Sequence, residues 1–289
     1  MIRVIVSDMD GTLLGTDHKL NCRTTEAIKK ACEEGIRFMI ATGRSFEGAM
    51  KELKQADIVC DYIVSSGAEL RDSQKNIIFS SAMKSEDYVN VYNVLQKYDI
   101  SFIFCTVEAD YCIGTRDVLK KNLFEHIITF DNNIVAEEIE ENEYYKRMAD
   151  RTKLVPDILS LLKLNPKVTK VFVFSNNLGM LDEIKAELSK NSNLAISSSF
   201  SNNLEVTDVS AQKGPVVKMY IEKLGYTMDE VMVIGDSLND YSMLSMDFGA
   251  TVAMGNAHPQ IKKVAKYVTK SNAEDGVAYL IEMLLKRRV

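Results

Sequence analysis

The feature that most constrains the fold is a series of short apolar runs, each of which ends in a small polar or acidic turn. Three of these pairs are residues 2–6 before Asp8-Met9-Asp10-Gly11, residues 37–41 before Thr42-Gly43-Arg44, and residues 231–234 before Gly235-Asp236-Ser237. Apolar side chains at both odd and even positions are typical of strands that are buried on both faces of a parallel sheet. Helical patterns separate the runs, so the sequence predicts an α/β fold with a doubly wound, Rossmann-like parallel sheet.

The chain of 289 residues is long enough for two domains, since a domain averages roughly 150 residues. Between about residues 84 and 205 the apolar segments carry more Glu, Lys and Asn, and they lack the turns described above. The first pattern returns near Thr207. We therefore expect a core domain formed by residues 1–83 and 206–289, interrupted by an inserted α+β domain of residues 84–205.

Local signals predict where helices of the core begin and end. Thr24 or Thr25 is expected to cap a helix that Gly35 ends. Pro215 suits the first position of a helix that runs to Leu224, because the N–H that proline lacks has no helical partner there.

The predicted sheet brings acidic residues together. Ligands of open α/β sheets lie beyond the carboxyl ends of the strands, and there the turns gather Asp8, Asp10, Asp236 and Asp240. Carboxylates this close repel each other unless a cation lies among them. Oxygen ligands suit Mg²⁺, which keeps several waters and a substrate phosphate in its shell. No histidine lies in these turns, so zinc is not expected.

A magnesium site with a spare carboxylate indicates phosphoryl transfer, in which a carboxylate can act as the nucleophile. Lys213, just before a predicted helix, offers a cation for the phosphoryl oxygens. Thr42 offers a hydroxyl, and the backbone N–H of Gly43 is not shielded by a side chain.

Each motif alone has an ordinary structural explanation. An Asp-Gly pair is a common turn former, Thr42-Gly43 is compatible with a helix cap, and a single lysine such as Lys213 is usually a solvated surface residue. The motifs occur together, in order, each at a predicted strand end or helix start. This joint placement favours the catalytic interpretation.

The motifs also resemble those of a known family. Asp8-Met9-Asp10-Gly11-Thr12-Leu13-Leu14, Ala41-Thr42-Gly43-Arg44, Lys213-Gly214 and Gly235-Asp236-Ser237-Leu238-Asn239-Asp240 are similar, in order and spacing, to the four signature motifs of the haloacid dehalogenase superfamily. The long insertion, together with Met254-Gly255-Asn256-Ala257 and the segment from Asn272 to Ala278, resembles the Cof-like branch with an α/β (type IIB) cap. This family usually has Asn where Ser66 stands, so the resemblance assigns Ser66 no role.

The resemblance implies a role for three acidic residues. Asp8 would be the nucleophile that forms an aspartyl-phosphate. Asp10 would protonate the leaving alcohol and then deprotonate the attacking water. The Asp8 carboxylate, the Asp10 backbone carbonyl and the Asp236 carboxylate would hold Mg²⁺. A carboxylate on the metal stays ionised while its neighbour can carry a proton, which is consistent with this division of roles.

The resemblance also implies how the phosphoryl group is held. Thr42, Gly43 and Lys213 would bind its oxygens, and Asn239 would lie with them as a supporting residue. Asp240 would orient Lys213 or a metal-bound water.

These observations predict a cytoplasmic, Mg²⁺-dependent phosphatase for a small phosphomonoester, such as a sugar phosphate or a phosphorylated cofactor. A phosphotransferase or phosphomutase on the same core is the enzymatic alternative, and a non-catalytic phospholigand-binding regulator is the alternative from another class. A net charge of −6 disfavours nucleic acid as a partner, and no apolar run reaches the ~18–20 residues of a membrane helix. Five cysteines without a CxxC pair fit a reducing compartment. We expect a monomer or a weak homo-oligomer.

Overall fold

Strand β1 (Val4–Ser7) is buried along its whole length and pairs with a parallel strand on each side. Val6, for example, lies opposite Met39 on one side and Val233 on the other. The computed structural model describes residues 1–128 and 134–286. Two-sided burial explains why the first apolar run contains hydrophobic residues at consecutive positions.

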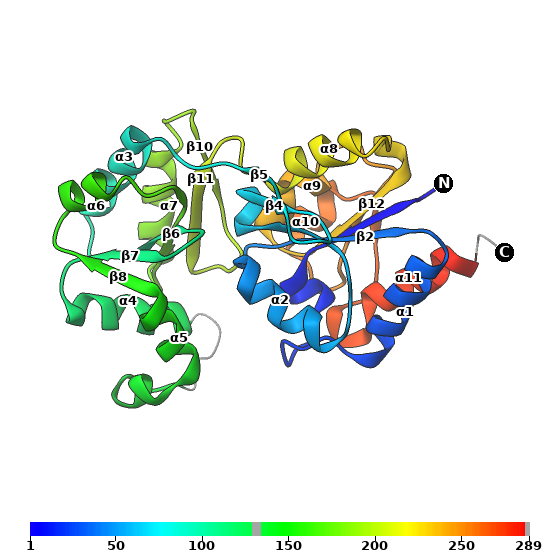
Figure 1. Cartoon of the computed structure of the whole chain (residues 1–289), viewed down its shortest axis with the longest axis horizontal. Coiled ribbons are helices and arrows are strands. Elements are labelled where there is room, and N and C mark those ends of the chain that lie inside the picture. The colour runs from blue at the N-terminus through cyan, green and yellow to red at the C-terminus, as the bar shows by residue number, and fades with distance from the viewer. Residues whose placement is uncertain (129–133, 287–289) are drawn as a thin grey trace. The chain divides into compact units, whose positions relative to one another are not determined.

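The sheet that contains β1 is mostly parallel (Figure 1). Its spatial order is β14 (Tyr267–Val268), β13 (Ala250–Ala253), β12 (Val231–Gly235), β1, β2 (Arg37–Ala41), β3 (Asp61–Val64), β4 (Glu69–Arg71) and β5 (Ile77–Ser80). The strands from β14 to β3 are parallel to one another, whereas β4 and β5 continue the sheet as an antiparallel hairpin. The predicted α/β class with a doubly wound parallel sheet is confirmed.

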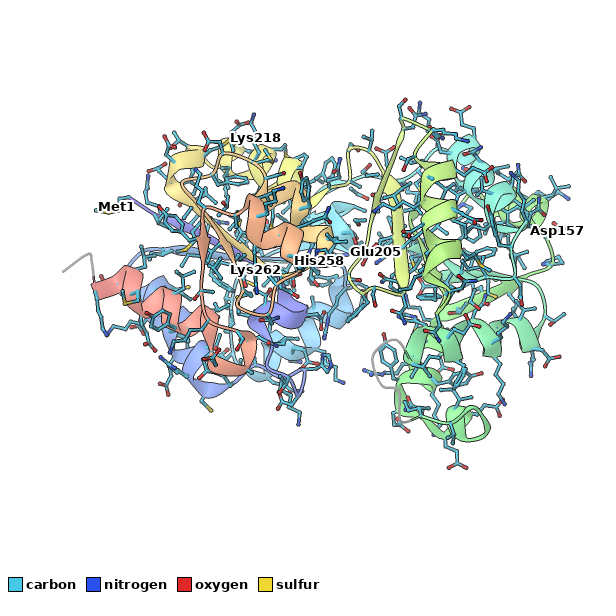
Figure 2. All side chains as sticks on the ribbon, turned by 180° about the vertical axis from the view of Figure 1, so that it is seen from behind. Met1, Asp157, Glu205, Lys218, His258 and Lys262 are labelled. Atoms are coloured by element: carbon cyan, nitrogen blue, oxygen red, sulfur yellow. The ribbon has the colours of Figure 1, made fainter. Side chains whose placement is uncertain are left out.

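Helices cover both faces of this sheet. They are α1 (Cys22–Glu33), α2 (Phe46–Gln55), α8 (Lys213–Lys223), α9 (Tyr241–Leu244), α10 (Pro259–Val264) and α11 (Gly276–Lys286). Helices α8 and α9 pack together on one side of the sheet, and α1 and α11 pack together on the other (Figure 1). Lys218 on the outer face of α8 points away from the sheet, as expected for the solvated face of an amphipathic helix (Figure 2).

The structure corrects two predicted helix starts. Helix α1 is capped by Asn21, whose side chain accepts a hydrogen bond from the backbone N–H of Thr24 at 2.8 Å, so the expected threonine cap is wrong. Helix α8 begins at Lys213 and places Pro215 at its third position. Proline is compatible with the whole first helical turn, because none of those N–H groups has a partner within the helix.

Contacts between residues divide the chain into two compact units. Residues up to Ser80 together with those from Ser210 form the unit just described, and Ser81–Val209 forms the other. The sheet of this second unit has the order β10 (Leu194–Ser197), β11 (Asn203–Asp208), β9 (Val168–Phe174), β6 (Ser101–Thr106), β7 (Asp110–Ile113) and β8 (Thr152–Val155). Its pairs are antiparallel except β7 with β8.

The helices of the second unit are α3 (Ser85–Leu95), α4 (Arg116–Ile128), α5 (Glu143–Arg151), α6 (Ile158–Leu164) and α7 (Leu178–Leu188). The α3 and α7 side chains form one apolar core with the sheet, while α4 and α5 pack over a smaller cluster on the opposite face. No helix in the described ranges combines the length and the apolar character needed to cross a bilayer.

A buried histidine lies in the smaller cluster. The His126 ring stacks on Phe174 at 4.7 Å between centroids and meets the edge of Phe172 at 5.1 Å. Nearby, Lys170 lies 3.6 Å from Glu205, and both side chains are almost fully buried. Burial lowers the pKa of His126 to about 3, with a further contribution from the Lys170 charge.

This histidine predicts a pH dependence of stability. The folded pKa of about 3 lies below the unfolded value of 6.5, so unfolded chains bind this proton first as the pH falls. The contribution of this residue to stability is complete above pH 6.5 and is lost towards pH 3, by up to about 5 kcal/mol. We expect His126→Phe to flatten the pH dependence of the unfolding free energy measured with urea. The exposed His258→Gln is the matched control, and a slope in His126→Phe equal to that of the wild type would contradict the assignment.

Candidate active site

The candidate site lies where the strand order of the first sheet reverses. From β1 the chain proceeds to β2 and β3 on one side, and from β12 it proceeds to β13 and β14 on the other. Ligand sites of doubly wound sheets occur beyond the carboxyl ends of the strands at such a switch point. Asp8 follows β1 and Asp236 follows β12. The backbone N–H of Asp8 donates to the carbonyl of Ile234 at 2.9 Å, which joins the two strand ends.

After Asp8 the chain makes one wide turn from Met9 to Leu13, closed by a hydrogen bond from Leu14 N–H to the Met9 carbonyl at 2.9 Å. Gly11 is in the left-handed region, with φ of 77°, and a Cβ at this position would collide with the Asp236 carboxylate. A glycine is therefore required for the two turns to approach each other. The Thr12 hydroxyl donates to Asp236 Oδ1 at 2.6 Å.

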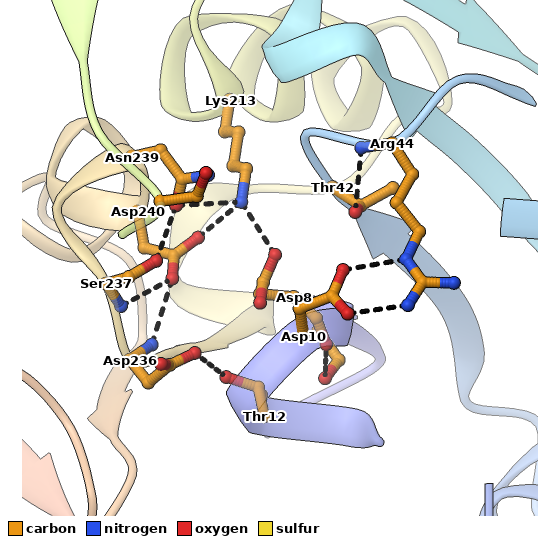
Figure 3. A network of polar contacts seen from close by, with 12 residues as sticks. Asp8, Asp10, Thr12, Thr42, Arg44, Lys213, Asp236, Ser237, Asn239 and Asp240 are labelled. Carbon is orange, nitrogen blue, oxygen red and sulfur yellow. Dashed lines mark hydrogen bonds and ion pairs between the residues drawn. The ribbon is translucent and has the colours of Figure 1, made fainter. Parts of the chain in front are cut away.

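A buried lysine is the centre of the site (Figure 3). Lys213 Nζ donates to Asp8 Oδ1 at 2.7 Å, to Asp240 Oδ1 at 2.6 Å and to Asn239 Oδ1 at 3.4 Å. Lys213 is the first residue of α8, whose start packs closely on α9. The ammonium therefore has three oxygen partners and no access to solvent through its side chain.

Asp240 is fully engaged by the protein. Its Oδ2 atom accepts the backbone N–H groups of Asp236 and Ser237 at 2.9 and 3.1 Å, while Oδ1 accepts Lys213. A Cβ at Gly235 would overlap the Asp240 carboxyl group, so this turn also depends on a glycine. Asp240 thus fixes the Asp236 turn and orients the lysine.

The turn after β2 carries Thr42 and Gly43. The backbone of Thr42 is fixed on both sides, because its N–H donates to Ile63 and its carbonyl accepts the N–H of Ser66. The Thr42 hydroxyl accepts the N–H of Arg44 at 3.2 Å. Thr42 is buried, whereas Gly43 is partly exposed.

The segment that contains Ser66 is strained. Ser65, Ser66 and Gly67 all have positive φ values of 50°, 61° and 99°. A Cβ at Gly67 would overlap the backbone of Gln212, the residue before Lys213. Consecutive left-handed residues that are not glycine cost energy and persist where the surroundings fix them. Here they tie the Thr42 turn to the start of α8.

Arg44 holds the second acidic residue of the first motif (Figure 3). Its Nε and Nη2 atoms donate to the two Asp10 carboxylate oxygens at 2.7 and 2.6 Å, and His18 Nδ1 lies 3.6 Å from the same carboxylate. This fork is the geometry in which arginine binds carboxylates most strongly. It joins the Thr42 turn to the Asp8 turn.

The charges of the site shift several pKa values. Burial and the neighbouring Asp240 charge raise the pKa of Asp8, although Lys213 opposes this. Burial and Asp240 also raise the pKa of Asp236 to about 7. Burial alone would lower the pKa of Lys213, but the charges of Asp240 and Asp8 outweigh it and raise that pKa. One ammonium therefore does not balance the three buried carboxylates.

Asp10 behaves differently. Burial would raise its pKa, but hydrogen bonds from His18 and Arg44 outweigh burial and lower the pKa of Asp10 to about 2. The family resemblance implies the opposite order, with Asp8 ionised and Asp10 able to carry a proton. In the structure the pKa of Asp10 is the lower one, because Asp10 has the Arg44 guanidinium beside it, whereas Asp8 shares the Lys213 ammonium with Asp240.

The carboxylates fit a hard divalent cation. Asp8, Asp236 and Asp240 each place an oxygen within 4.8 Å of the others. Because the Asp240 oxygens already accept three hydrogen bonds, Asp8 and Asp236 are the carboxylates that a metal would use. The all-oxygen donor set suits Mg²⁺. The Asp10 side chain turns to Arg44, which leaves its backbone carbonyl as the expected ligand.

The structure brings the expected site residues together in two linked groups. Asp8, Lys213, Asn239 and Asp240 form direct contacts, and Asp236 joins them through its N–H. Thr42 is connected to Asp8 through Arg44 and Asp10, one chain turn away.

Four contacting residues were not expected from the sequence. They are Thr12, His18, Arg44 and Ser237. Thr12, Arg44 and Ser237 lie inside the quoted motifs, and this position in the sequence could have marked them as site residues. His18 lies outside every motif.

Comparison with known proteins gives the family. A sequence profile of the haloacid dehalogenase-like hydrolases matches residues 5–281. Two relatives from Bacillus subtilis (strain 168), YcsE and YwtE, are both named 5-amino-6-(5-phospho-D-ribitylamino)uracil phosphatase. YcsE is 28% identical over 281 residues, which cover 97% of this chain and 94% of YcsE. YwtE is 29% identical over 286 residues, which cover 98% of each chain.

The fold has a close structural counterpart. A solved haloacid dehalogenase-like hydrolase from B. subtilis superposes with a TM-score of 0.82, at 24% identity, and the match covers 98% of this chain and 100% of the other. The profile spans nearly the whole chain, and YcsE and YwtE, which match over nearly their whole length, are both named phosphatases. This chain therefore belongs to the haloacid dehalogenase-like hydrolases and is a phosphatase.

Proposed function

We propose that the protein hydrolyses small phosphomonoesters in two displacements, with Mg²⁺ bound and with Asp8 as the nucleophile. The observation that carries this proposal is the buried contact of Lys213 with Asp8 and Asp240, beside the Asp236 carboxylate. A site with two buried carboxylates, one partly buried carboxylate and one ammonium attracts a further cation, and the cation and ammonium together attract a phosphate.

In the first displacement an Asp8 oxygen attacks phosphorus and the bond to the leaving oxygen breaks. Asp10 gives its proton to that oxygen, so that an alcohol leaves. In the second displacement a water attacks the aspartyl-phosphate, and Asp10 takes the proton of this water. The bond between Asp8 and phosphorus breaks, inorganic phosphate is released, and both side chains return to their starting states.

Lys213, Thr42 and Gly43 hold the phosphoryl oxygens in this proposal. Lys213 stays charged because its pKa is raised. Its position is fixed by Asp240 and Asn239, so little reorganisation accompanies the reaction. The Thr42 backbone is anchored to β3 and to the strained Ser66 turn, which keeps its hydroxyl in place.

Mg²⁺ fits the Asp8 and Asp236 carboxylates with the Asp10 carbonyl, and it would neutralise charge on the phosphoryl oxygens. A cation beside Asp8 also lowers the pKa of that carboxyl, which keeps the nucleophile ionised. Asp10 becomes an acid only after its carboxylate leaves the Arg44 fork, because that fork favours the ionised form.

The substrate class is a small phosphate ester of an alcohol. The substrate in the names of YcsE and YwtE is a phosphorylated ribityl compound, which is an ester of this kind. We assign catalysis to the core of residues 1–83 and 206–289 and substrate selection to the inserted cap of residues 84–205. The proposed location is the cytoplasm, with no nucleic-acid partner, and the proposed state is a monomer or a weak homo-oligomer.

Replacement of the nucleophile tests the first step. We expect Asp8→Asn to abolish phosphate release, with water as the sole acceptor, while the fold is kept because the amide oxygen can still accept from Lys213. Thermal unfolding checks the fold, and Asp229→Asn, at an exposed position of the same unit, is the control. Turnover of an aryl phosphate by Asp8→Asn would exclude Asp8 as the nucleophile. A wild type that transfers phosphate to sugars but not to water would be a phosphotransferase.

Metal binding has a readout that does not depend on turnover. We expect Mg²⁺ to raise the melting temperature, since a ligand at 100 times its Kd stabilises the folded state by about 2.7 kcal/mol. Asp236→Asn should remove most of this shift, because it removes one of the two carboxylates assigned to the metal. Asp229→Asn should keep it. An unchanged shift in Asp236→Asn would place the cation elsewhere.

The acid role of Asp10 predicts a dependence on the leaving group. We expect Asp10→Asn to lower kcat/KM for a sugar phosphate by about 100-fold or more, because an alkoxide needs a proton to leave. A nitrophenyl phosphate, whose leaving group needs no proton, should lose less than about tenfold. Steady-state kinetics on both esters measures this difference. Equal losses for the two esters would show that Asp10 is not the acid.

A further inference from the structure

We propose that Asn256 and Asn272 are positioning residues that hold the Asp8 turn and the Asp236 turn at a fixed separation. The inference rests on the proposed function, because it concerns the two turns assigned to the metal. It assigns a role to the segments around Asn256 and Asn272, to which the sequence motifs assigned none.

The two asparagines contact the turn that follows Asp8 at its middle and at its C-terminal end. Asn256 Nδ2 donates to the carbonyl of Gly11 at 2.8 Å, and Asn272 Nδ2 donates to the carbonyl of Leu14 at 3.0 Å. The asparagines are also joined to each other, since the backbone N–H of Asn272 donates to Asn256 Oδ1 at 3.0 Å. The middle and the C-terminal end of the wide turn are therefore held by one connected pair.

The segment that carries Asn256 contacts the second turn as well. His258 N–H donates to the carbonyl of Asp236 at 2.8 Å. His258 and Lys262 belong to the start and the body of α10 (Figure 2), and Lys262 Nζ donates to the carbonyl of Gly255. The residues from 255 to 258 thus form a bridge from the Gly11 carbonyl to the Asp236 carbonyl.

The bridge holds the Asp8 turn and the Asp236 turn together at a point where their carboxylates repel each other. Gly11 lies against the Asp236 carboxylate so closely that no side chain fits, and the Asp8 and Asp236 carboxylates repel. A backbone that is held by hydrogen bonds does not relax away from this repulsion. An error of about 1 Å in such a separation can cost about 100-fold in rate.

The positioning role of Asn256 and Asn272 can be distinguished from a role in core packing, because both side chains reach the surface. Asn256 is exposed and Asn272 is partly exposed, so neither supplies much buried apolar surface. Their removal should therefore leave the fold almost as stable as before. This makes the positioning role measurable by itself.

The test compares Asn256→Ala, Asn272→Ala and the control Asn76→Ala. Asn76 is exposed in the same unit and makes a similar side-chain hydrogen bond, to Asp72 at 3.0 Å, away from the bridge. Alanine is preferable to aspartate, because a new carboxylate would itself attract the cation. Calorimetric titration with Mg²⁺, thermal unfolding and kcat/KM with a sugar phosphate are measured for each variant.

We expect both bridge variants to weaken Mg²⁺ binding by about fivefold to tenfold, the worth of one hydrogen bond, and to lower kcat/KM by about tenfold to 100-fold. The control should change neither. The double variant should lose little more than the worse single one, because the two residues act as one unit. Bridge variants that only melt earlier, with Mg²⁺ affinity and kcat/KM like those of Asn76→Ala, would overturn the inference. A wild type that neither binds Mg²⁺ nor releases phosphate would instead refute the proposed function.

Discussion

The buried ammonium of Lys213 is the interaction on which the rest of the site depends. It lies between Asp8 and Asp240, and removal of one partner from such a buried pair costs about 3–5 kcal/mol, because an unpaired charge remains. The same contacts position Asp8, the proposed nucleophile, orient the Asp236 turn through Asp240, and anchor the first residue of α8. The packing of the site and its proposed chemistry therefore depend on the same side chains.

The sheet supplies the positions that this ammonium requires. Because β1 and β12 are parallel neighbours at the reversal of strand order, their carboxyl ends bring Asp8 and Asp236 together from positions more than two hundred residues apart in the sequence. Gly11 and Gly235 then allow an approach that any side chain would prevent. The strained Ser66 turn connects the Thr42 turn to α8 on the far side. Several loops are thus fixed to one another before any ligand binds.

The sequence predicts which candidate site residues come together better than it predicts the contacts that they make. Strand ends are local signals, so the convergence of Asp8, Asp236 and Asp240 followed from the predicted sheet, whereas the place of Lys213 followed from the family resemblance. Which threonine or asparagine caps α1 depends on backbone angles that no pattern of residue types fixes, and Asn21 is the cap instead of Thr24. The hydrogen bonds of Asn256 to Gly11 and of Arg44 to Asp10 could not be predicted, because the whole fold sets the distance between those segments.

The Arg44 fork on Asp10 has a consequence for how the reaction is controlled. A carboxylate with a pKa of about 2 has no proton to give near neutral pH, so Asp10, the proposed acid, is ionised while Arg44 holds it. The fork is two charge-assisted hydrogen bonds, which a phosphate ester can offer to the guanidinium in exchange. A substrate that draws Arg44 to its own oxygens would release Asp10 beside the leaving oxygen. The released carboxylate would then take up a proton from solvent, and the acid would be available only when an ester is present.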